Sequence, residues 1–239
     1  MLLFFGNGGT QFVLEVTALK LEETVGDDIY AQLLTLVSEE KRNRAGRFRF
    51  IKDAQRTVLG DVMARSAICR HTGVRNSEIV FTANRYGKPL LQRPEGIHFN
   101  IAHSGNWIVC ALDHTHVGVD VEVIKPIEMA IAKRFFSMRE YRFLMQQPES
   151  VQVMNFFKIW TLKESFIKED GRGMSIPLDS FSILPEEADR SIRTVAEAEV
   201  GFYQTYLDSE SVFALCTAHS LEPVSIRPVT PQSLIEQVL

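Results

Sequence analysis

One seven-residue stretch limits the possible folds of this chain more than any other, because apolar and polar residues alternate through it without interruption. Valine stands at every odd position from 117 to 123, and the even positions hold Gly118, Asp120 and Glu122. This alternation predicts a β-strand with one valine face and one face bearing two carboxylates. The carboxylates would lie about 6.6 Å apart along such a strand and could share one divalent cation. The alternative is the polar, solvent-facing side of a half-buried strand.

The pattern of apolar residues changes from helical to strand-like twice along the 239 residues. In the first half it predicts a strand within 10–20, helices over 28–37 and 52–71, and strands near 79–81, 98–101 and 107–112. In the second half it predicts helices over 127–145 and 151–169, and strands near 117–123, 179–184, 201–207 and 212–218. Ser38 is a predicted helix N-cap, and Gly73 a predicted helix stop. We therefore expect an α+β protein with two lobes, 1–117 and 118–239, and a site in the cleft between them.

The helix predicted over 151–169 supplies a third carboxylate. Trp160, Glu164 and Lys168 follow one another at four-residue intervals and so share one helix face. Two carboxylates on a strand and one on a helix suit Mg²⁺, which takes further oxygen ligands from water and from substrate phosphates. Lys168 could bind those same phosphates. The alternative is a surface Glu164–Lys168 ion pair worth less than about 1 kcal/mol.

Charge is distributed unevenly along the chain. Lys and Arg number 26 against 30 Asp and Glu, so the whole protein has no general attraction for nucleic acid or anionic lipid. The stretch 41–56 nevertheless holds seven basic residues and one acidic residue. Such a block is typical of a site for a small polyanion, or of a solvated helix face. Lys88 follows Gly87, which lets the backbone approach a ligand closely.

Cysteine usage indicates a reducing compartment, and hydropathy indicates neither a membrane span nor a signal peptide. Cys69, Cys110 and Cys216 are widely separated and form no C-x-x-C motif, which predicts reduced, buried thiols. No run of about 18 apolar residues occurs, and the five apolar residues at the amino terminus are too few for a signal peptide. We expect a cytoplasmic protein.

His103 is a lone histidine between a predicted strand and the turn Ser104-Gly105-Asn106, and both a structural and a functional role are open for it. The glycine-rich stretches match neither a P-loop nor a dinucleotide-binding fingerprint, and no Gly-x-Ser-x-Gly elbow is present.

Four ordered motifs give the sequence a resemblance to a known family. They are Gly87-Lys88-Pro89, Phe99-Asn100-Ile101-Ala102-His103-Ser104, Val117-Gly118-Val119-Asp120-Val121-Glu122 and Trp160-Thr161-Leu162-Lys163-Glu164-Ser165-Phe166-Ile167-Lys168. In this order the chain resembles the Sfp-type 4′-phosphopantetheinyl transferases over nearly its whole length. It looks closest to the bacterial enzymes that serve non-ribosomal peptide synthetases, and hence antibiotic biosynthesis.

The resemblance implies a two-lobed, pseudo-twofold monomer that binds coenzyme A in its cleft. Such an enzyme moves the phosphopantetheine arm of coenzyme A onto a serine of an acyl or peptidyl carrier protein and releases adenosine 3′,5′-bisphosphate. Asp120, Glu122 and Glu164 match the family's Mg²⁺ ligands, and Glu164 also matches its candidate base for the serine. The matching positions for coenzyme A phosphates and the nucleotide end are His103, Lys168, Lys41, Arg44, Thr57, Lys88 and Pro89. Two departures are Ala102, where relatives often have Ser, and Arg44, where a relative has Lys.

Segment 124–145 mixes apolar and basic residues, Lys133 and Arg134 among them, and is the predicted carrier-protein surface, with loop 171–180 as a second candidate. An ordinary amphipathic helix is the alternative for that segment. Neither nucleic acid nor a membrane is an expected partner. Two other functions stay open on the residues alone: a metal-dependent phosphodiesterase or nuclease, and a non-enzymatic coenzyme A- or nucleotide-binding module.

Overall fold

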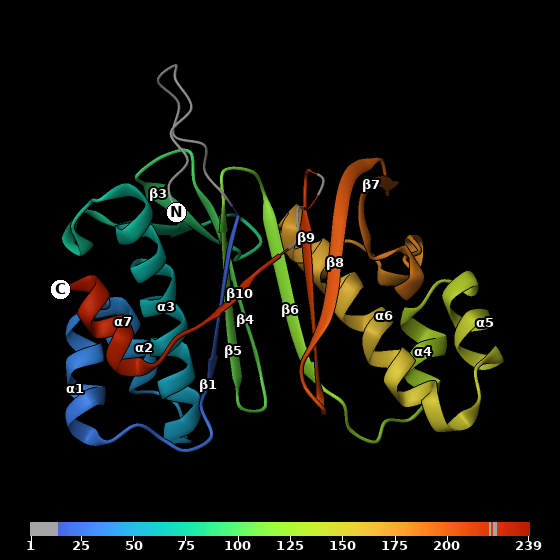
Figure 1. Ribbon diagram of the computed structural model, residues 1–239, viewed down its shortest axis with the longest axis horizontal. Coiled ribbons are helices and arrows are strands. Elements are labelled where there is room, and N and C mark those ends of the chain that lie inside the picture. The colour runs from blue at the N-terminus through green and yellow to red at the C-terminus, as the bar shows by residue number, and fades with distance from the viewer. Residues whose placement is uncertain (1–13, 220, 222–223) are drawn as a thin grey trace.

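Two four-stranded β-sheets stand side by side at the centre of the molecule, and helices cover the outer side of each sheet (Figure 1). The computed structural model describes residues 14–219, 221 and 224–239. The amino-terminal apolar run, and the part of the predicted first strand before residue 14, lie outside the described residues. The arrangement confirms the α+β prediction.

The first lobe begins with one strand and three helices and continues with two pairs of strands. Its elements are β1 (Glu15–Lys20), α1 (Asp27–Thr35), α2 (Glu39–Ala45), α3 (Ile51–Thr72), β2 (Val80–Ala83), β3 (Pro89–Arg93), β4 (His98–Ser104) and β5 (Trp107–Asp113). The four-stranded sheet has the order β10-β1-β5-β4, and β2 and β3 form a separate two-stranded sheet. Helix α3 packs against β5, and every residue from Val58 to Ile68 is buried.

The second lobe has a similar order of elements, with one strand and three helices followed by three strands. It consists of β6 (Val117–Val123), α4 (Ala130–Phe135), α5 (Met138–Gln146), α6 (Glu149–Asp170), β7 (Asp189–Val195), β8 (Ala198–Asp208) and β9 (Ser211–Thr217). Its sheet has the order β6-β9-β8-β7. The strand that precedes the helices of each lobe pairs antiparallel with a later strand, β1 with β5 and β6 with β9.

Local signals repeat between the lobes as well. The second short helix of each lobe begins at a serine whose side chain accepts a hydrogen bond from the backbone, Ser38 from Lys41 and Ser137 from Glu140, both at 3.2 Å. The long helix of each lobe, α3 and α6, has 22 residues and ends at a glycine in the left-handed conformation. The two lobes are therefore similar in topology, although their sequences do not align as a repeat.

The two sheets meet at β6. Its valine side joins an apolar cluster with Ala102 of β4 and with Val109 and Ala111 of β5. On the opposite side α6 lies directly against the strand: a Cβ atom added at Gly118 would stand 2.0 Å from the carbonyl oxygen of Ser165. The face that bears Asp120 and Glu122 is thus covered by a helix, and the interpretation as a solvent-facing strand side is wrong.

Three expectations for the secondary structure need correction. The predicted strand over 179–184 is absent, and short 3₁₀ turns at Leu178–Ser180 and Pro185–Glu187 stand around it. The helix predicted over 127–145 is two helices, because Ser137 caps a new helix after Phe136. Strand β7 was not expected, since its sequence lacks a clear alternation of apolar and polar residues.

The carboxyl-terminal segment lies in the first lobe, although its residues were expected in the second. Strand β10 (Ile226–Pro228) pairs parallel with β1, and helix α7 (Pro231–Val238) packs against α3. Glu15 of β1 accepts hydrogen bonds from Arg227 of β10 at 3.1 and 3.3 Å. The returning strand covers an edge of β1 that would otherwise present unpaired backbone groups.

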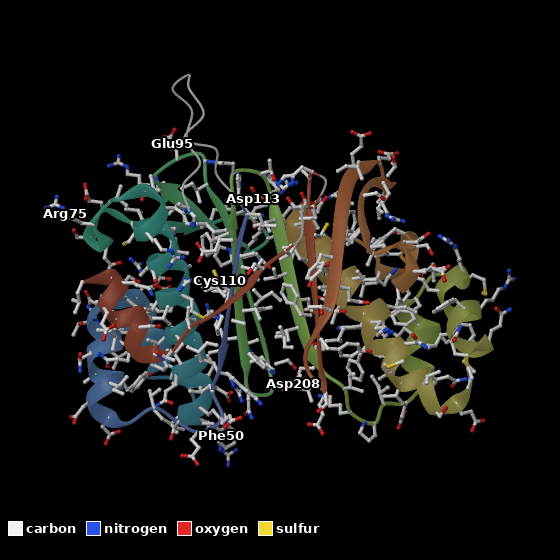
Figure 2. The ribbon with its side chains drawn as sticks, in the orientation of Figure 1. Phe50, Arg75, Glu95, Cys110, Asp113 and Asp208 are labelled. Atoms are coloured by element: carbon white, nitrogen blue, oxygen red, sulfur yellow. The ribbon has the colours of Figure 1, made fainter. Side chains whose placement is uncertain are left out.

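The cysteines are placed as expected. All three are free thiols, with Cys110 and Cys216 buried and Cys69 partly buried. Figure 2 shows Cys110 in the interior of the first lobe, where it belongs to the core cluster between α3 and the sheet. Across the parts of the chain that the structure describes, none of the helices combines the length and apolar character needed to cross a membrane.

Candidate active site between the lobes

Asp120 is the most deeply buried of the predicted site residues. Its side chain lies between β6 and α6, and the ammonium of Lys168 donates a hydrogen bond to its Oδ1 at 2.5 Å. The second oxygen, Oδ2, is buried and has no hydrogen-bond partner among the residues that the structure describes. Burial raises the pKa of Asp120 to about 7; Lys168 opposes this, and the negative charges of Glu122 and Glu164 add to it.

Helix α6 brings Glu164 and Lys168 to this strand, as their four-residue spacing predicts. Burial raises the pKa of Glu164, the nearby Lys168 lowers it, and Glu122 raises it. Burial alone would lower the pKa of Lys168, but Asp120, Glu164 and Glu122 together hold it above its ordinary value. The four side chains therefore act on one another electrostatically, and a carboxylate with a raised pKa can take up a proton near neutral pH.

Glu122 of β6 and His103 of β4 lie where the two lobes meet. The hydroxyl of Ser104 donates a hydrogen bond to Oε2 of Glu122 at 2.8 Å. His103, the preceding residue on β4, is exposed, and its pKa is lowered by partial desolvation and by the positive charges of Arg56 and Lys168. This histidine belongs to the same electrostatic neighbourhood as the carboxylates.

The three predicted metal ligands, Asp120, Glu122 and Glu164, are not grouped as a metal site in the structure. Among residues 14–219, 221 and 224–239, no three His, Cys, Asp or Glu side chains are grouped so that they could hold a metal ion. The two strand carboxylates have separate partners instead, Lys168 for Asp120 and Ser104 for Glu122. The donor set still fits Mg²⁺, because the ligands are carboxylate oxygens and the buried Oδ2 of Asp120 lacks a partner within the described part of the chain.

A hollow of about 510 Å³ brings three of the predicted nucleotide-end residues together. Lys41 and Arg44 of α2 line it from one side and Pro89 of β3 from the other. Lys41 pairs with the buried Asp61 at 3.2 Å, and Arg65 donates to Asp61 at 2.6 Å. Sequence analysis missed Asp61 and Arg65; their i, i+4 spacing was the available signal, but it stands inside an apolar helix pattern.

Lys88 and Thr57 do not line that hollow. The ammonium of Lys88 donates hydrogen bonds to the backbone carbonyls of Glu169 at 3.0 Å and Val117 at 3.4 Å, at the carboxyl end of α6. Burial lowers the pKa of Lys88. Thr57 is half-buried on α3, next to Arg56. The structure thus places Lys88 at the contact between the lobes.

The basic block 41–56 divides between different surroundings. Arg42 donates hydrogen bonds to the carbonyls of Leu34 and Val37 at 3.3 and 2.6 Å, where α1 ends. Lys52 donates to Oδ1 of Asn106 at 2.8 Å. Figure 2 shows Phe50, just before α3, at one end of the molecule. Only Lys41 and Arg44 of the block line the large hollow, so much of its charge has a structural or solvated role.

The segment expected to dock a carrier protein has a mixed character. Most apolar side chains of 124–145 pack against α6 in a core cluster, including Phe136 and Leu144. Lys133 and Arg134 on α4 are exposed, and so is Met138 at the start of α5. The amphipathic-helix alternative therefore accounts for the buried residues, and the basic residues remain available at the surface.

The fold and site define a two-lobed α+β protein with acidic and basic side chains gathered where the lobes meet, and comparison with known proteins identifies the class. Residues 116–218 match the 4'-phosphopantetheinyl transferase superfamily, and residues 26–115 match the family described as 4'-phosphopantetheinyl transferase, N-terminal. This chain belongs to the 4′-phosphopantetheinyl transferase family and is an enzyme of that family.

Three relatives illustrate the similarity. The 4'-phosphopantetheinyl transferase Sfp of Bacillus subtilis (strain 168) is 38% identical over 224 residues, which cover 93% of this chain and 100% of the relative. A 4'-phosphopantetheinyl transferase of Bacillus subtilis is 43% identical over 79% of this chain and 85% of its own length. The 4'-phosphopantetheinyl transferase psf-1 of Bacillus pumilus is 40% identical over 87% of this chain and 90% of its own.

Proposed function

We propose that this enzyme transfers the 4′-phosphopantetheine moiety of coenzyme A to a serine hydroxyl of an acyl or peptidyl carrier protein in a Mg²⁺-dependent reaction. One bond forms between the serine oxygen and the phosphorus of the arm. The bond from that phosphorus to the departing adenosine 3′,5′-bisphosphate breaks. The observation that carries the proposal is the buried carboxylate of Asp120, with Lys168 on one oxygen and, among the described residues, no partner on the other.

The chain's own residues suit the separate tasks of this reaction. Lys41 and Arg44 line a hollow that would hold the nucleotide end of coenzyme A, with Pro89 opposite them. Lys168 and His103 supply positive or hydrogen-bonding groups for the phosphates. Lys88 directly precedes β3 and Thr57 lies on α3, and their contact with the nucleotide end is part of the proposal.

Glu164 is the proposed base. Its raised pKa makes it a competent acceptor for the proton that leaves the serine hydroxyl as the oxygen attacks. Asp120, Glu122 and Glu164 would hold the Mg²⁺ ion, which when bound neutralises charge on the phosphate oxygens. Lys168, already at hydrogen-bond distance from Asp120, would stabilise the same developing charge from the protein side.

The setting is proposed on the same grounds. The relatives named above are bacterial, and the chain's lack of disulfide bonds among its three cysteines is typical of the cytoplasm. We propose a monomer that acts on carrier domains of non-ribosomal peptide synthesis, and hence in antibiotic biosynthesis. No nucleic acid or membrane partner is part of this proposal.

Mass spectrometry of the carrier tests the reaction directly. The purified protein is incubated with coenzyme A, Mg²⁺ and an apo carrier domain, and the carrier is then weighed. A gain of one phosphopantetheine arm, abolished by EDTA and absent when the acceptor serine is replaced by alanine, supports the proposal. Hydrolysis of coenzyme A or of nucleic acid without any gain in carrier mass would instead identify a phosphodiesterase or nuclease.

A further inference from the structure

The strand β4 of the first lobe reaches the backbone of β6 in the second lobe through side chains. Oδ1 of Asn100 accepts a hydrogen bond from the backbone N–H of Val119 at 2.9 Å. Four residues further along β4, the hydroxyl oxygen of Ser104 accepts one from the N–H of Val123 at 3.3 Å. These two bonds lie on either side of the strand positions that hold Asp120 and Glu122, so they fix this part of β6 relative to the first lobe.

Ser104 differs from Asn100 in that it also contacts a carboxylate. Its hydroxyl donates its only hydrogen to Oε2 of Glu122 at 2.8 Å while its oxygen accepts from the N–H of Val123. The donor and an acceptor capacity of this hydroxyl are then both in use, and its orientation is set. The glutamate side chain and the backbone of the next residue are held by a single atom.

The turn after Ser104 makes this approach possible. Gly105 has a φ of 56°, and a Cβ atom added there would stand 2.4 Å from Cγ2 of Val123. Glycine therefore allows the β4–β5 turn to lie directly against the end of β6. His103, on the other side of Ser104, belongs to the phosphate-binding residues of the proposed function. Ser104 thus stands between a residue proposed for phosphate and one proposed for metal.

We infer that Ser104 is a positioning residue, which orients the Glu122 carboxylate for a divalent cation and ties that carboxylate to the strand that carries His103. The inference rests on the proposed function for the identity of the cation. Groups that orient metal ligands typically change metal affinity about 10- to 100-fold when they are removed. The ligand concerned is a hard divalent cation such as Mg²⁺, because the oriented group is a carboxylate.

The test is a calorimetric titration of Mg²⁺ into protein saturated with coenzyme A, in the absence of any carrier protein. Ser104→Ala is expected to weaken Mg²⁺ binding about tenfold, while coenzyme A binding measured in EDTA stays unchanged. Ser104→Thr keeps the hydroxyl and should restore much of the affinity. If the alanine variant does not fold, Ser104→Cys, which is close in size and a weak donor, takes its place.

Asn100→Ala is the matched control. It removes the other bond between β4 and β6 without touching a carboxylate, so it should lower the thermal unfolding temperature and leave the Mg²⁺ affinity unchanged. Unaltered Mg²⁺ binding in Ser104→Ala, or an equal loss in Asn100→Ala, would overturn the inference. A wild-type protein that binds no Mg²⁺ overturns both this inference and the metal part of the proposed function. If the wild type binds Mg²⁺ but transfers nothing, the proposed function fails and the titration still decides the role of Ser104.

Discussion

The ammonium of Lys168 lies 2.5 Å from Oδ1 of the buried Asp120, whose Oδ2 has no hydrogen-bond partner in the part of the chain that the structure describes. A single cation on one side of a buried carboxylate, with Glu122 and Glu164 close enough to raise its pKa, leaves excess negative charge at the junction of the lobes. Such an arrangement lowers the stability of the ligand-free protein and favours the binding of a further cation.

Replacing Asp120 by Asn should therefore stabilise the ligand-free protein and remove its response to Mg²⁺. At about pH 8, above the pKa of about 7, the wild-type carboxylate is charged and buried beside two others. Removal of this buried charge should raise the thermal unfolding temperature by about 2–4 °C for each kcal/mol gained. Differential scanning calorimetry with and without Mg²⁺ and coenzyme A measures both effects. An Asp120→Asn protein that is less stable, or that still gains stability from Mg²⁺, would contradict this prediction.

Glu164→Gln should abolish transfer while coenzyme A still binds. Glutamine keeps the shape of the side chain but cannot accept the serine proton, and loss of a general base typically costs about 10²- to 10⁴-fold in rate. Single-turnover transfer measured by mass spectrometry gives the rate, and calorimetry gives the coenzyme A affinity. Normal turnover in this variant would refute the assignment of Glu164.

Reversal of charge on α4 should weaken recognition of the carrier protein. Lys133 and Arg134 are exposed on α4, so Lys133→Glu together with Arg134→Glu should raise the KM for an acidic carrier. The KM for coenzyme A should not change, because the hollow lined by Lys41 and Arg44 belongs to the other lobe. The matched control is reversal of the exposed Arg75 in the first lobe, which Figure 2 shows at the far side of the molecule. An unchanged KM for the carrier would show that Lys133 and Arg134 of α4 do not take part in carrier recognition.

Breaking the fully buried ion pair between Lys163 and Glu140 should strongly destabilise the protein. Lys163 donates to both carboxylate oxygens at 2.7 and 2.8 Å and to the carbonyl of Phe181 at 2.8 Å. Lys163→Met leaves the Glu140 charge buried without its partner and should cost about 3–5 kcal/mol in the free energy of unfolding. Adding Glu140→Gln to that variant should restore part of the loss. Urea unfolding checks this, and additive losses would show that the pair is not coupled.

Glu15 should make the stability of the protein depend on pH in the acidic range. Burial alone would raise its pKa, but hydrogen bonds from His71, Arg70 and Arg227 hold it at about 2, against an ordinary value of 4.5. The lowered pKa stabilises the protein above pH 4.5, and this contribution of about 3 kcal/mol is lost as the pH falls from 4.5 to about 2. Glu15→Gln should be less stable than the wild type at neutral pH, and the difference should shrink across that interval. A constant difference in urea unfolding between neutral pH and about pH 2 would rule this out.

The strongest local patterns were predicted from the sequence and then found. The alternation of valines from 117 to 123 gave a strand of those bounds, and the apolar spacing in 52–71 gave most of α3. Ser38 caps α2 as its residue type predicts. Where the pattern is weak, as in β7, or interrupted by a cap, as at Ser137, the prediction failed. These are local signals, and they succeed where neighbouring residues alone decide the backbone conformation.

Tertiary structure decided which side chains and strand faces come into contact with one another. Residue spacing left the carboxylate side of β6 open between solvent and a covered site, and the packing of α6 on Gly118 determined that it is covered. Spacing also could not show that β10 returns to β1, that Lys88 turns toward the end of α6, or that Ser104 contacts Glu122. Each of these contacts joins residues distant in the chain. The sequence thus determined which elements form and which chemical groups they hold, while the distances and partners of those groups arose only when the two lobes packed together.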